Sequence, residues 1–212
     1  MNRYLLNTQG IQVNRKRMRR LMRLMRLEAI YPQPRLSLPD KEHRKYPYLL
    51  RDLAIKRPDQ VWGTDITYLR LTGGFAYLVA FIDWYSRYVL SFEVSTALDY
   101  QFCLSAFQRA LQSGKPEIHN SDQGVQFTCK DYTDAVLQEG IQLSMDGKGR
   151  ALDNVFTERL WRTVKYENIY IRDYRSPKEA SLGLKDYFNF YNYLRPHASL
   201  KGKTPSEIYG VK

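Results

Sequence analysis

Residues 61–71 read Val-Trp-Gly-Thr-Asp-Ile-Thr-Tyr-Leu-Arg-Leu, a run rich in β-branched and aromatic residues that predicts a strand. A second run of this kind, 75–84, follows after Thr-Gly-Gly at 72–74, which is a hairpin signal. A third run, 88–95, follows a turn at 86–87. The sequence therefore predicts a domain that opens with three antiparallel strands.

Helices and strands alternate after these three strands. The pattern predicts helices over 99–112 and 130–138, and strands over 117–121 and 141–145. Two long amphipathic helices, 151–169 and 177–194, are expected near the end of the chain. This order of elements is typical of an α/β domain with a mixed sheet. About 150 residues are enough for such a domain to bury its own core.

The positive charge of the chain is concentrated in its first quarter. The 212 residues carry 33 Lys and Arg against 22 Asp and Glu, a net charge of +11. Residues 1–57 hold 15 basic and 4 acidic residues, whereas 58–212 hold 18 of each. Such a charge indicates an anionic partner, either nucleic acid or a lipid surface. The aromatic content of 14% excludes a disordered tail.

Several protein classes are excluded by what the sequence lacks. The longest uncharged apolar run, 75–82, is eight residues long, whereas a membrane span needs about 20. The N-terminus has no apolar run of signal-peptide length, so a cytoplasmic protein is expected. Cys103 and Cys129 have no CxxC partner and there are only three histidines, which excludes a disulfide framework and a zinc module.

The N-terminal region divides into a basic helix and a proline-rich segment. Residues 12–30 carry apolar side chains at helical spacing beside many arginines, and Asn14 can cap the helix. Residues 31–58 hold five of the nine prolines, which predicts an extended linker. We therefore expect an arm over 1–30, a linker over 31–58 and a core domain over 59–212.

Three acidic residues lie at positions where an acid is costly or where ligands bind. Asp65 lies within the first predicted strand, and Asp122 follows the fourth, at the edge where open α/β sheets bind ligands. Glu158 shares a helix face with Arg162 and Lys165. Each acid also has a non-catalytic interpretation. Asp65 could be a solvent-facing strand residue, Asp122 an ordinary turn residue, and Glu158 a surface charge paired with Arg162.

The sequences around these acids resemble a known family. The matching stretches are VWGTDITYL around Asp65, NSDQGVQFT around Asp122, SMDGKGRALDNVFTERLWRTVKYE around Glu158, and YFNFYNYLRPHASLKGKTPSEIY at the end. With 35 residues between the second and third acid, they resemble the DDE transposases of bacterial insertion sequences, of the second-frame (orfB) type with a retroviral-integrase-like core. The resemblance implies a ribonuclease-H-like α/β fold, a mixed sheet flanked by helices, preceded by a basic helical arm.

The resemblance also implies a site and a reaction. Asp65, Asp122 and Glu158 would be the catalytic triad and would bind two Mg²⁺ (or Mn²⁺) ions, for which carboxylates are suitable ligands. The expected activity is metal-dependent DNA cleavage and strand transfer by a polynucleotidyl transferase, which amounts to transposition. The residues expected to contact DNA are Arg15, Lys16, Arg19, Arg20, Arg23, Arg162 and Lys165.

The resemblance implies partners as well. The arm resembles the last helix of a helix-turn-helix segment, so double-stranded DNA is expected as the main partner. A homo-oligomer on DNA, a first-frame transposase protein and a location on the bacterial nucleoid are also expected. Because the family's complete members carry further helices ahead of this one, an N-terminally shortened transposase is expected.

Three alternatives remain open at this stage. One is an inactive remnant that binds DNA non-specifically or interferes with the full-length transposase. Another is a nuclease that hydrolyses DNA without strand transfer. The third is a basic amphipathic arm on anionic lipid, although the arm has no Trp or Phe anchor for a membrane.

Other features have structural interpretations. Asp83, at the end of the second strand, is expected to hold a turn. The aromatic residues of 187–193 recur at helical spacing and are expected in the core rather than stacked on bases. His197 is expected to take part in ending that helix, not in catalysis.

Overall fold

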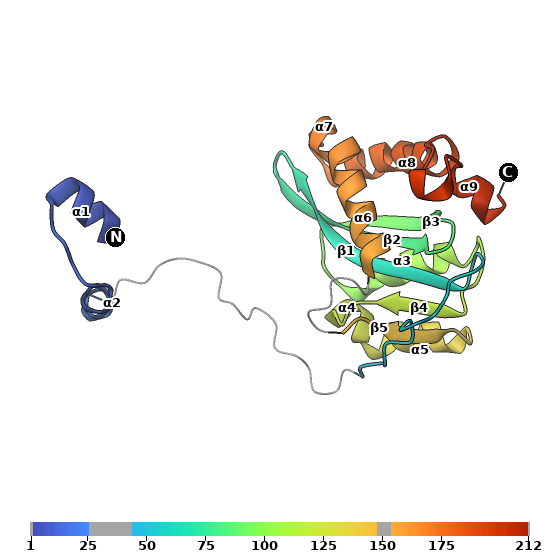
Figure 1. Cartoon of the computed structure of the whole chain (residues 1–212), viewed down its shortest axis with the longest axis horizontal. Coiled ribbons are helices and arrows are strands. Elements are labelled where there is room, and N and C mark those ends of the chain that lie inside the picture. The colour runs from blue at the N-terminus through green and yellow to red at the C-terminus, as the bar shows by residue number, and fades with distance from the viewer. Residues whose placement is uncertain (1, 26–43, 148–153, 212) are drawn as a thin grey trace. The chain divides into compact units, whose positions relative to one another are not determined.

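The structure is a computed structural model that describes residues 2–25, 44–147 and 154–211. The chain divides into two compact units, Met1–Pro39 and Asp40–Lys212. The strands and α-helices of the second unit are labelled in Figure 1. In chain order its elements are β1 (Val61–Leu71), β2 (Gly74–Asp83), β3 (Val89–Ser95), α3 (Tyr100–Ala110), β4 (Ile118–Ser121), α4 (Val125–Thr128), α5 (Lys130–Gln138), β5 (Gln142–Met145), α6 (Val155–Val164), a π-helix (Lys165–Ile169), α7 (Tyr170–Arg172), α8 (Pro177–Tyr193), a 3₁₀ turn (Ala198–Leu200) and α9 (Pro205–Tyr209).

The five strands form one mixed sheet in the order β3-β2-β1-β4-β5. The first three strands pair antiparallel, as predicted, whereas β4 pairs parallel with both β1 and β5. β1 therefore lies in the middle of the sheet with a neighbour on each side. The strands begin and end within one residue of the predicted ranges. The prediction of a mixed α/β sheet is confirmed.

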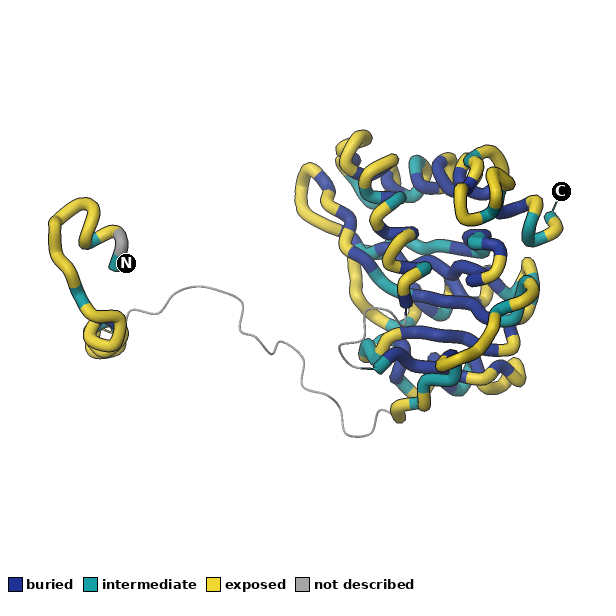
Figure 2. The backbone as a smooth tube through the Cα atoms, viewed as in Figure 1, coloured by how far each residue is buried: buried dark blue, intermediate teal, exposed yellow. Residues whose placement is uncertain are grey.

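Both faces of the sheet are covered by helices, and successive side chains of a strand point to opposite faces. On β2, Leu78, Ala80 and Ile82 pack in a cluster with side chains of α6 and α8, whereas Val79 and Phe81 pack in a second cluster with α3 and α5. Figure 2 shows most of the sheet as buried, whereas the hairpin end of β1 and β2 and much of the helices are exposed. The core therefore has two layers of helix around one sheet.

The described residues of the first unit, 2–25, form two helices, α1 (Asn2–Gln9) and α2 (Arg15–Leu24). As predicted, Asn14 caps α2, and its side chain accepts a hydrogen bond from the Lys16 N–H (2.8 Å). The rest of the predicted helix, 26–30, lies outside the described residues. The sequence pattern did not predict α1, which is eight residues long; helices so short depend on packing rather than on propensity.

The structure differs from the predicted linker in its second half. Residues 31–43 lie outside the described residues, and 44–58 contain no helix or strand. Residues 44–58 nevertheless pack on the core: Leu50 is buried, and the Leu49 N–H donates to Ser144 Oγ (3.0 Å). The prolines prevent a helix, as expected, but the apolar residues between them add to the core.

The predicted helix 151–169 is also modified. Residues 151–153 lie outside the described residues, α6 ends at Val164, and a π-helix over 165–169 leads into α7. Tertiary contacts accompany the π-helix: Asn168 Oδ1 accepts from the Tyr174 hydroxyl (2.7 Å) and Glu167 binds Arg195. The periodicity of apolar residues along one helix does not predict such contacts.

Within the described residues, no helix combines the length and apolar character needed to cross a membrane.

Candidate active site

Asp65 lies in the middle of β1, on the face of the sheet that α6 covers (Figure 1). Its carboxylate accepts two hydrogen bonds, one from the Ile66 N–H to Oδ1 (2.8 Å) and one from the Trp161 Nε1–H to Oδ2 (2.9 Å). The residue is only partly exposed. Asp65 is therefore a fixed acid at the junction of sheet and helix, and the alternative of a freely solvated strand residue does not hold.

Asp122 directly follows β4, the parallel neighbour of β1. The strand register pairs Gly63 with Asn120, so each acid lies two residues beyond the last paired residue of its segment, and the charge of Asp122 acts on Asp65. Asp122 Oδ1 accepts a hydrogen bond from the Gly124 N–H (2.9 Å), which orients the side chain in the turn before α4. Although the residue is exposed, protein atoms around the carboxyl restrict its hydration and raise its pKa.

Glu158 lies in the first turn of α6. Helix α6 is held against β1 at two points: Trp161 reaches Asp65, and the Asn154 Nδ2 donates to the Thr64 carbonyl (3.4 Å). Glu158 lies between these two points in the helix sequence and is exposed. Among the described residues its carboxylate has no hydrogen bond or ion pair, so the alternative of a Glu158–Arg162 surface pair is not observed.

The charges of the three acids act on one another. The pKa of Asp65 is raised to about 6: burial is the largest cause, and the negative charges of Asp122 and Glu158 act in the same direction, whereas the hydrogen bonds from Trp161 and Ile66 oppose them. Residues from three separate elements therefore form one acidic cluster. Within residues 2–25, 44–147 and 154–211, however, no three acidic, histidine or cysteine side chains lie as close together as the ligands of one metal ion.

A buried polar network supports the turn that carries Asp122. The Asn120 Nδ2 donates to Asp146 Oδ1 (2.8 Å), and the Gln123 Nε2 donates to the Asp146 carbonyl (2.9 Å). The Ser144 hydroxyl in turn donates to Asn120 Oδ1 (2.8 Å). Sequence reasoning missed this network because its members are ordinary turn and strand residues until β4 and β5 pair.

Trp161 is a second residue that sequence reasoning missed. Its position three residues after Glu158 indicates only an apolar helix face, and its hydrogen bond to Asp65 depends on how α6 docks on the sheet.

The interpretation of Asp83 is confirmed: its carboxylate is buried and accepts from the Ser86 N–H (2.7 Å) and the Asp59 N–H (2.9 Å). Asp83 therefore stabilises the turn between β2 and β3.

The predicted DNA-contacting residues fall into two groups. Arg162 is exposed on α6, and Lys165 is partly exposed at the start of the π-helix, on the same side of the helix as Glu158. The other residues, on α2 of the first unit, are all exposed and line one open groove: Arg15, Lys16, Arg19, Arg20 and Arg23.

Comparisons with known proteins identify the family. Two family models, both described as integrase core domain, match residues 55–151 and 139–205. The chain is 30% identical over 214 residues to the InsK protein of insertion sequence IS150 from Escherichia coli (strain K12), covering 95% of this chain and 73% of the relative. The chain belongs to the insertion-sequence DDE transposases of the orfB type.

Other members of this transposase family are similar in the same way. The transposase of insertion sequence IS904 from Lactococcus lactis is 30% identical over 213 residues, covering 96% of this chain and 83% of the relative. Family membership supports transposition as the function, and the comparisons give no support to an inactive remnant.

Solved structures show the same fold at low sequence identity. The HTLV-2 integrase catalytic core domain, solved in complex with magnesium, superposes with a TM-score of 0.59 at 20% identity, covering 72% of this chain and 97% of that one. The simian T-cell lymphotropic virus intasome, solved in complex with PP2A regulatory subunit B56 gamma, gives a TM-score of 0.63 at 17% identity, covering 82% and 61%. The transposase core therefore has the ribonuclease-H-like fold of retroviral integrase cores.

Proposed function

We propose that this transposase cleaves DNA at the end of an insertion element and joins the exposed end to target DNA, with Asp65, Asp122 and Glu158 as its catalytic residues. The observation that carries the proposal is the acidic cluster on β1, β4 and α6, in which two neighbouring negative charges raise the pKa of Asp65. Fold stability alone gives no reason to gather three acids. Cleavage of a phosphodiester does, because divalent cations at such a site assist the reaction.

The donor set of the cluster fits a divalent cation. All three side chains supply carboxylate oxygens, which Mg²⁺ and Mn²⁺ prefer. The negative charges of Asp122 and Glu158 also raise the pKa of Asp65, which means that they repel its carboxylate. Because like charges repel, bringing the three carboxylates together on one site would be costly without a cation, and a bound cation would remove this cost. We propose two ions, held by Asp65, Asp122 and Glu158.

Each residue has a defined part in the proposed reaction. Two divalent cations bound there would activate the attacking oxygen and stabilise charge on the leaving oxygen. Asp65 is held in position by Trp161 and Ile66, and Asp122 by Gly124. A water molecule would first cleave one strand at the element end, and the released 3′-hydroxyl would then attack a target phosphodiester at the same site.

The basic residues would hold the DNA during these steps. Lys165, seven residues after Glu158, would bind a backbone phosphate beside the acidic cluster, and Arg162 lies on the same helix. The arginines of α2 would bind DNA through the first unit. We further propose that the chain acts as a homo-oligomer on double-stranded DNA, together with a first-frame protein, in the bacterial cytoplasm on the nucleoid.

The test uses the purified full chain and labelled oligonucleotides with and without a candidate element end, in Mg²⁺ or Mn²⁺. The proposal predicts metal-dependent nicking at the element end followed by joined products. Nicked products without joined ones would indicate a nuclease and contradict strand transfer. DNA binding with neither product, for every candidate end tried, would indicate a DNA-binding remnant.

A further inference from the structure

A cavity rich in arginine lies beside α6, outside the acidic cluster. It has a volume of about 550 Å³, and helix α6 and the segment after α8 supply much of its lining. We name it the arginine cavity after its basic lining residues, which are Arg87, Arg159, Arg162, Arg195 and His197. Of these residues, only Arg162 has a role in the proposed function.

The positive charge of the arginine cavity is mostly uncompensated. Its acidic lining residue, Glu167, is already bound by Arg195 through two hydrogen bonds (2.8 and 2.6 Å) and by the Tyr187 hydroxyl (2.9 Å). Arg87, Arg159 and Arg162 form no ion pair with any residue in the described part of the chain. The positive charge of Arg159 acts on Arg87, and an anion bound between them would relieve this repulsion.

Arg87 contributes a buried donor that lacks a partner. Its Nη1 is fully buried and makes no hydrogen bond within the described residues, although its guanidinium lies 3.5 Å from the centre of the Phe156 ring. Burial lowers the pKa of Arg87 to about 10, and the charge of Arg159 acts in the same direction, whereas Tyr191 and Asp83 oppose it. The group stays charged at neutral pH, and its buried donor is costly without an acceptor.

His197 supplies a second buried atom without a partner. Its side chain is 8% exposed and packs edge-to-face on Tyr191, with ring centres 4.6 Å apart. Its Nε2 has no hydrogen-bond partner among the described residues. Two polar groups that line one cavity are therefore left unsatisfied by the protein itself, which points to a ligand.

The backbone fixes Arg87 in place before any ligand binds. Arg87 has a φ of 67°, a left-handed conformation that is uncommon for a residue with a side chain. Its N–H donates to the Asp83 carbonyl (2.8 Å), and the Asp83 carboxylate holds Ser86 in the same turn. The guanidinium is thus presented by a rigid turn, which reduces the entropy lost when an anion binds.

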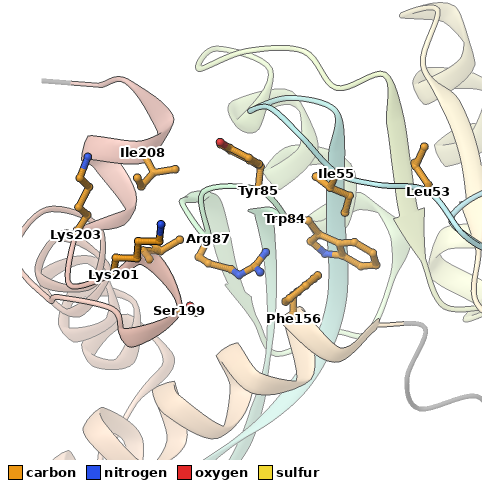
Figure 3. A pocket seen from close by; sticks show the side chains of 11 residues that line it. Leu53, Ile55, Trp84, Tyr85, Arg87, Phe156, Ser199, Lys201, Lys203 and Ile208 are labelled. Carbon is orange, nitrogen blue, oxygen red and sulfur yellow. The ribbon is translucent and has the colours of Figure 1, made fainter.

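A second cavity continues the basic surface. It has a volume of about 660 Å³ and shares Arg87 and Phe156 with the arginine cavity. Figure 3 shows Arg87 above Phe156, with Trp84 on one side and Lys201 on the other. A single small anion would occupy only the arginine cavity. Here the basic surface continues from the arginine cavity into a second cavity with aromatic lining residues, which suits a polymer that has both repeated phosphates and bases.

We propose that the arginine cavity binds a backbone phosphate of DNA, with the adjoining nucleotide directed into the cavity lined by Trp84 and Phe156. The ligand is a phosphodiester, whose oxygens accept hydrogen bonds from Arg87 and Arg159. This inference rests on the proposed function, because it takes DNA as the substrate. It adds a site of DNA contact that is separate from Lys165 and from the arm.

The test measures how DNA affinity depends on salt. The full chain binds a labelled duplex, followed by fluorescence anisotropy, over a series of salt concentrations without divalent metal. Each phosphate contact contributes about one unit to the slope of log affinity against log salt. Arg159→Gln should lower the slope by about one unit. Arg159 is exposed, so its replacement leaves the core intact, and Arg87→Gln provides a second variant with the same expected effect.

The matched control is Arg70→Gln, which removes the same charge from an exposed position on β1. The proposal predicts an unchanged slope for this control. Equal slopes for the wild-type chain, both cavity variants and the control would overturn the proposal. So would an equal decrease in all three variants, because that would reflect net charge alone.

A second arm separates DNA from a free anion. Inorganic phosphate is titrated against the wild-type chain and Arg159→Gln, with the melting temperature as readout. Stabilisation that requires Arg159, together with an unchanged DNA slope, would assign the cavity to a free anion and overturn the proposal. Neither measurement requires cleavage. The chain could therefore lack the proposed cleavage activity and still bind DNA through the arginine cavity, or cleave DNA without using this cavity, and the two sets of experiments distinguish these results.

Discussion

Asp65 shows at the scale of one residue how the fold sets the chemistry of an acid. Its position in the central strand limits hydration, and the two neighbouring acids add repulsion, so its pKa is raised to about 6. The two hydrogen bonds that it accepts favour the charged form. In the absence of a cation, the Asp65 carboxyl group therefore changes between its protonated and charged forms at a pH of about 6.

The hydrogen bond from Trp161 has a measurable effect. Trp161→Phe removes the donor, so the charged form of Asp65 loses stabilisation and its pKa should rise above about 6 in the metal-free chain. Carboxyl-carbon NMR during a pH titration measures the change. Trp84→Phe is the matched control, because Trp84 is also buried but its indole N–H has no partner among the described residues. A pKa of Asp65 that stays unchanged or falls in Trp161→Phe would contradict this account.

Sequence reasoning found the acids but not the residues that position them. Asp65 and Asp122 were singled out by their places in the strand pattern, and the family resemblance implied their catalytic role; the two acids lie on or directly after the neighbouring parallel strands β1 and β4. Trp161 and Asn154 act through contacts between α6 and β1, and those contacts depend on tertiary docking. Arg87 lies in a turn whose left-handed conformation has no clear sequence signal, since it is not a glycine.

Among the elements, β1 is the most constrained by its neighbours. It pairs on both sides, it contains Asp65, and its Gly63 lies against a buried tryptophan from the end of β2. A Cβ at Gly63 would clash with Trp84 Nε1 and lie 2.8 Å from Trp84 Cε2. The glycine is therefore required by packing, since its backbone conformation is open to any residue.

This constraint predicts the effect of Gly63→Ala. The added methyl group must displace Trp84, so the free energy of unfolding should fall by about 1–3 kcal/mol. Urea denaturation measures the change. Gly73→Ala, in the turn between β1 and β2, is the control, because a Cβ there meets nothing within 4 Å. Equal stability of the two variants would show that Trp84 relaxes without cost.

The strands were predicted closely, whereas several helical details were not. Runs of β-branched and aromatic residues and the Gly-Gly turn locate β1 to β3, because these signals are local. The short helices α1 and α4 and the π-helix at 165–169 were missed. The π-helix is held by contacts with distant segments, such as the bond between Glu167 and Arg195, which is absent from any local window.

For the whole molecule, net charge is a poor guide to where anions bind. Residues 58–212 are formally neutral, yet they contain both an acidic cluster and the arginine cavity. Charges of opposite sign are gathered into separate regions of one domain. The basic excess of residues 1–57 was located correctly from the sequence, but the arrangement within the core required the structure.

The stability of the core should depend on pH through His119. The residue is fully buried, its ring stacks on Phe81, and burial lowers its pKa from 6.5 to about 3. Below pH 6.5 the unfolded chain therefore binds a proton that the folded chain does not. The free energy of unfolding is therefore unaffected by His119 above pH 6.5, and it falls by about 1.4 kcal/mol for each pH unit below that value.

His119→Gln removes this titration and leaves a polar side chain near the Tyr132 hydroxyl, which lies 2.9 Å from His119 Nε2. Between pH 7 and 5 the variant should lose about 2 kcal/mol less stability than the wild-type chain. Denaturant unfolding at a series of pH values measures the difference. Parallel curves for the two proteins would show that His119 is protonated in the folded state.

The central claim is that Asp65, Asp122 and Glu158 together carry out metal-dependent DNA cleavage. The most direct measurement is the rate of cleavage and strand transfer of an element-end oligonucleotide in Mn²⁺ by three proteins: the wild-type chain, Asp122→Asn, and Asp186→Asn as a control at an exposed position on α8. We predict that Asp122→Asn loses both reactions and still binds DNA, while Asp186→Asn keeps the wild-type rates. Retained cleavage by Asp122→Asn would contradict the account.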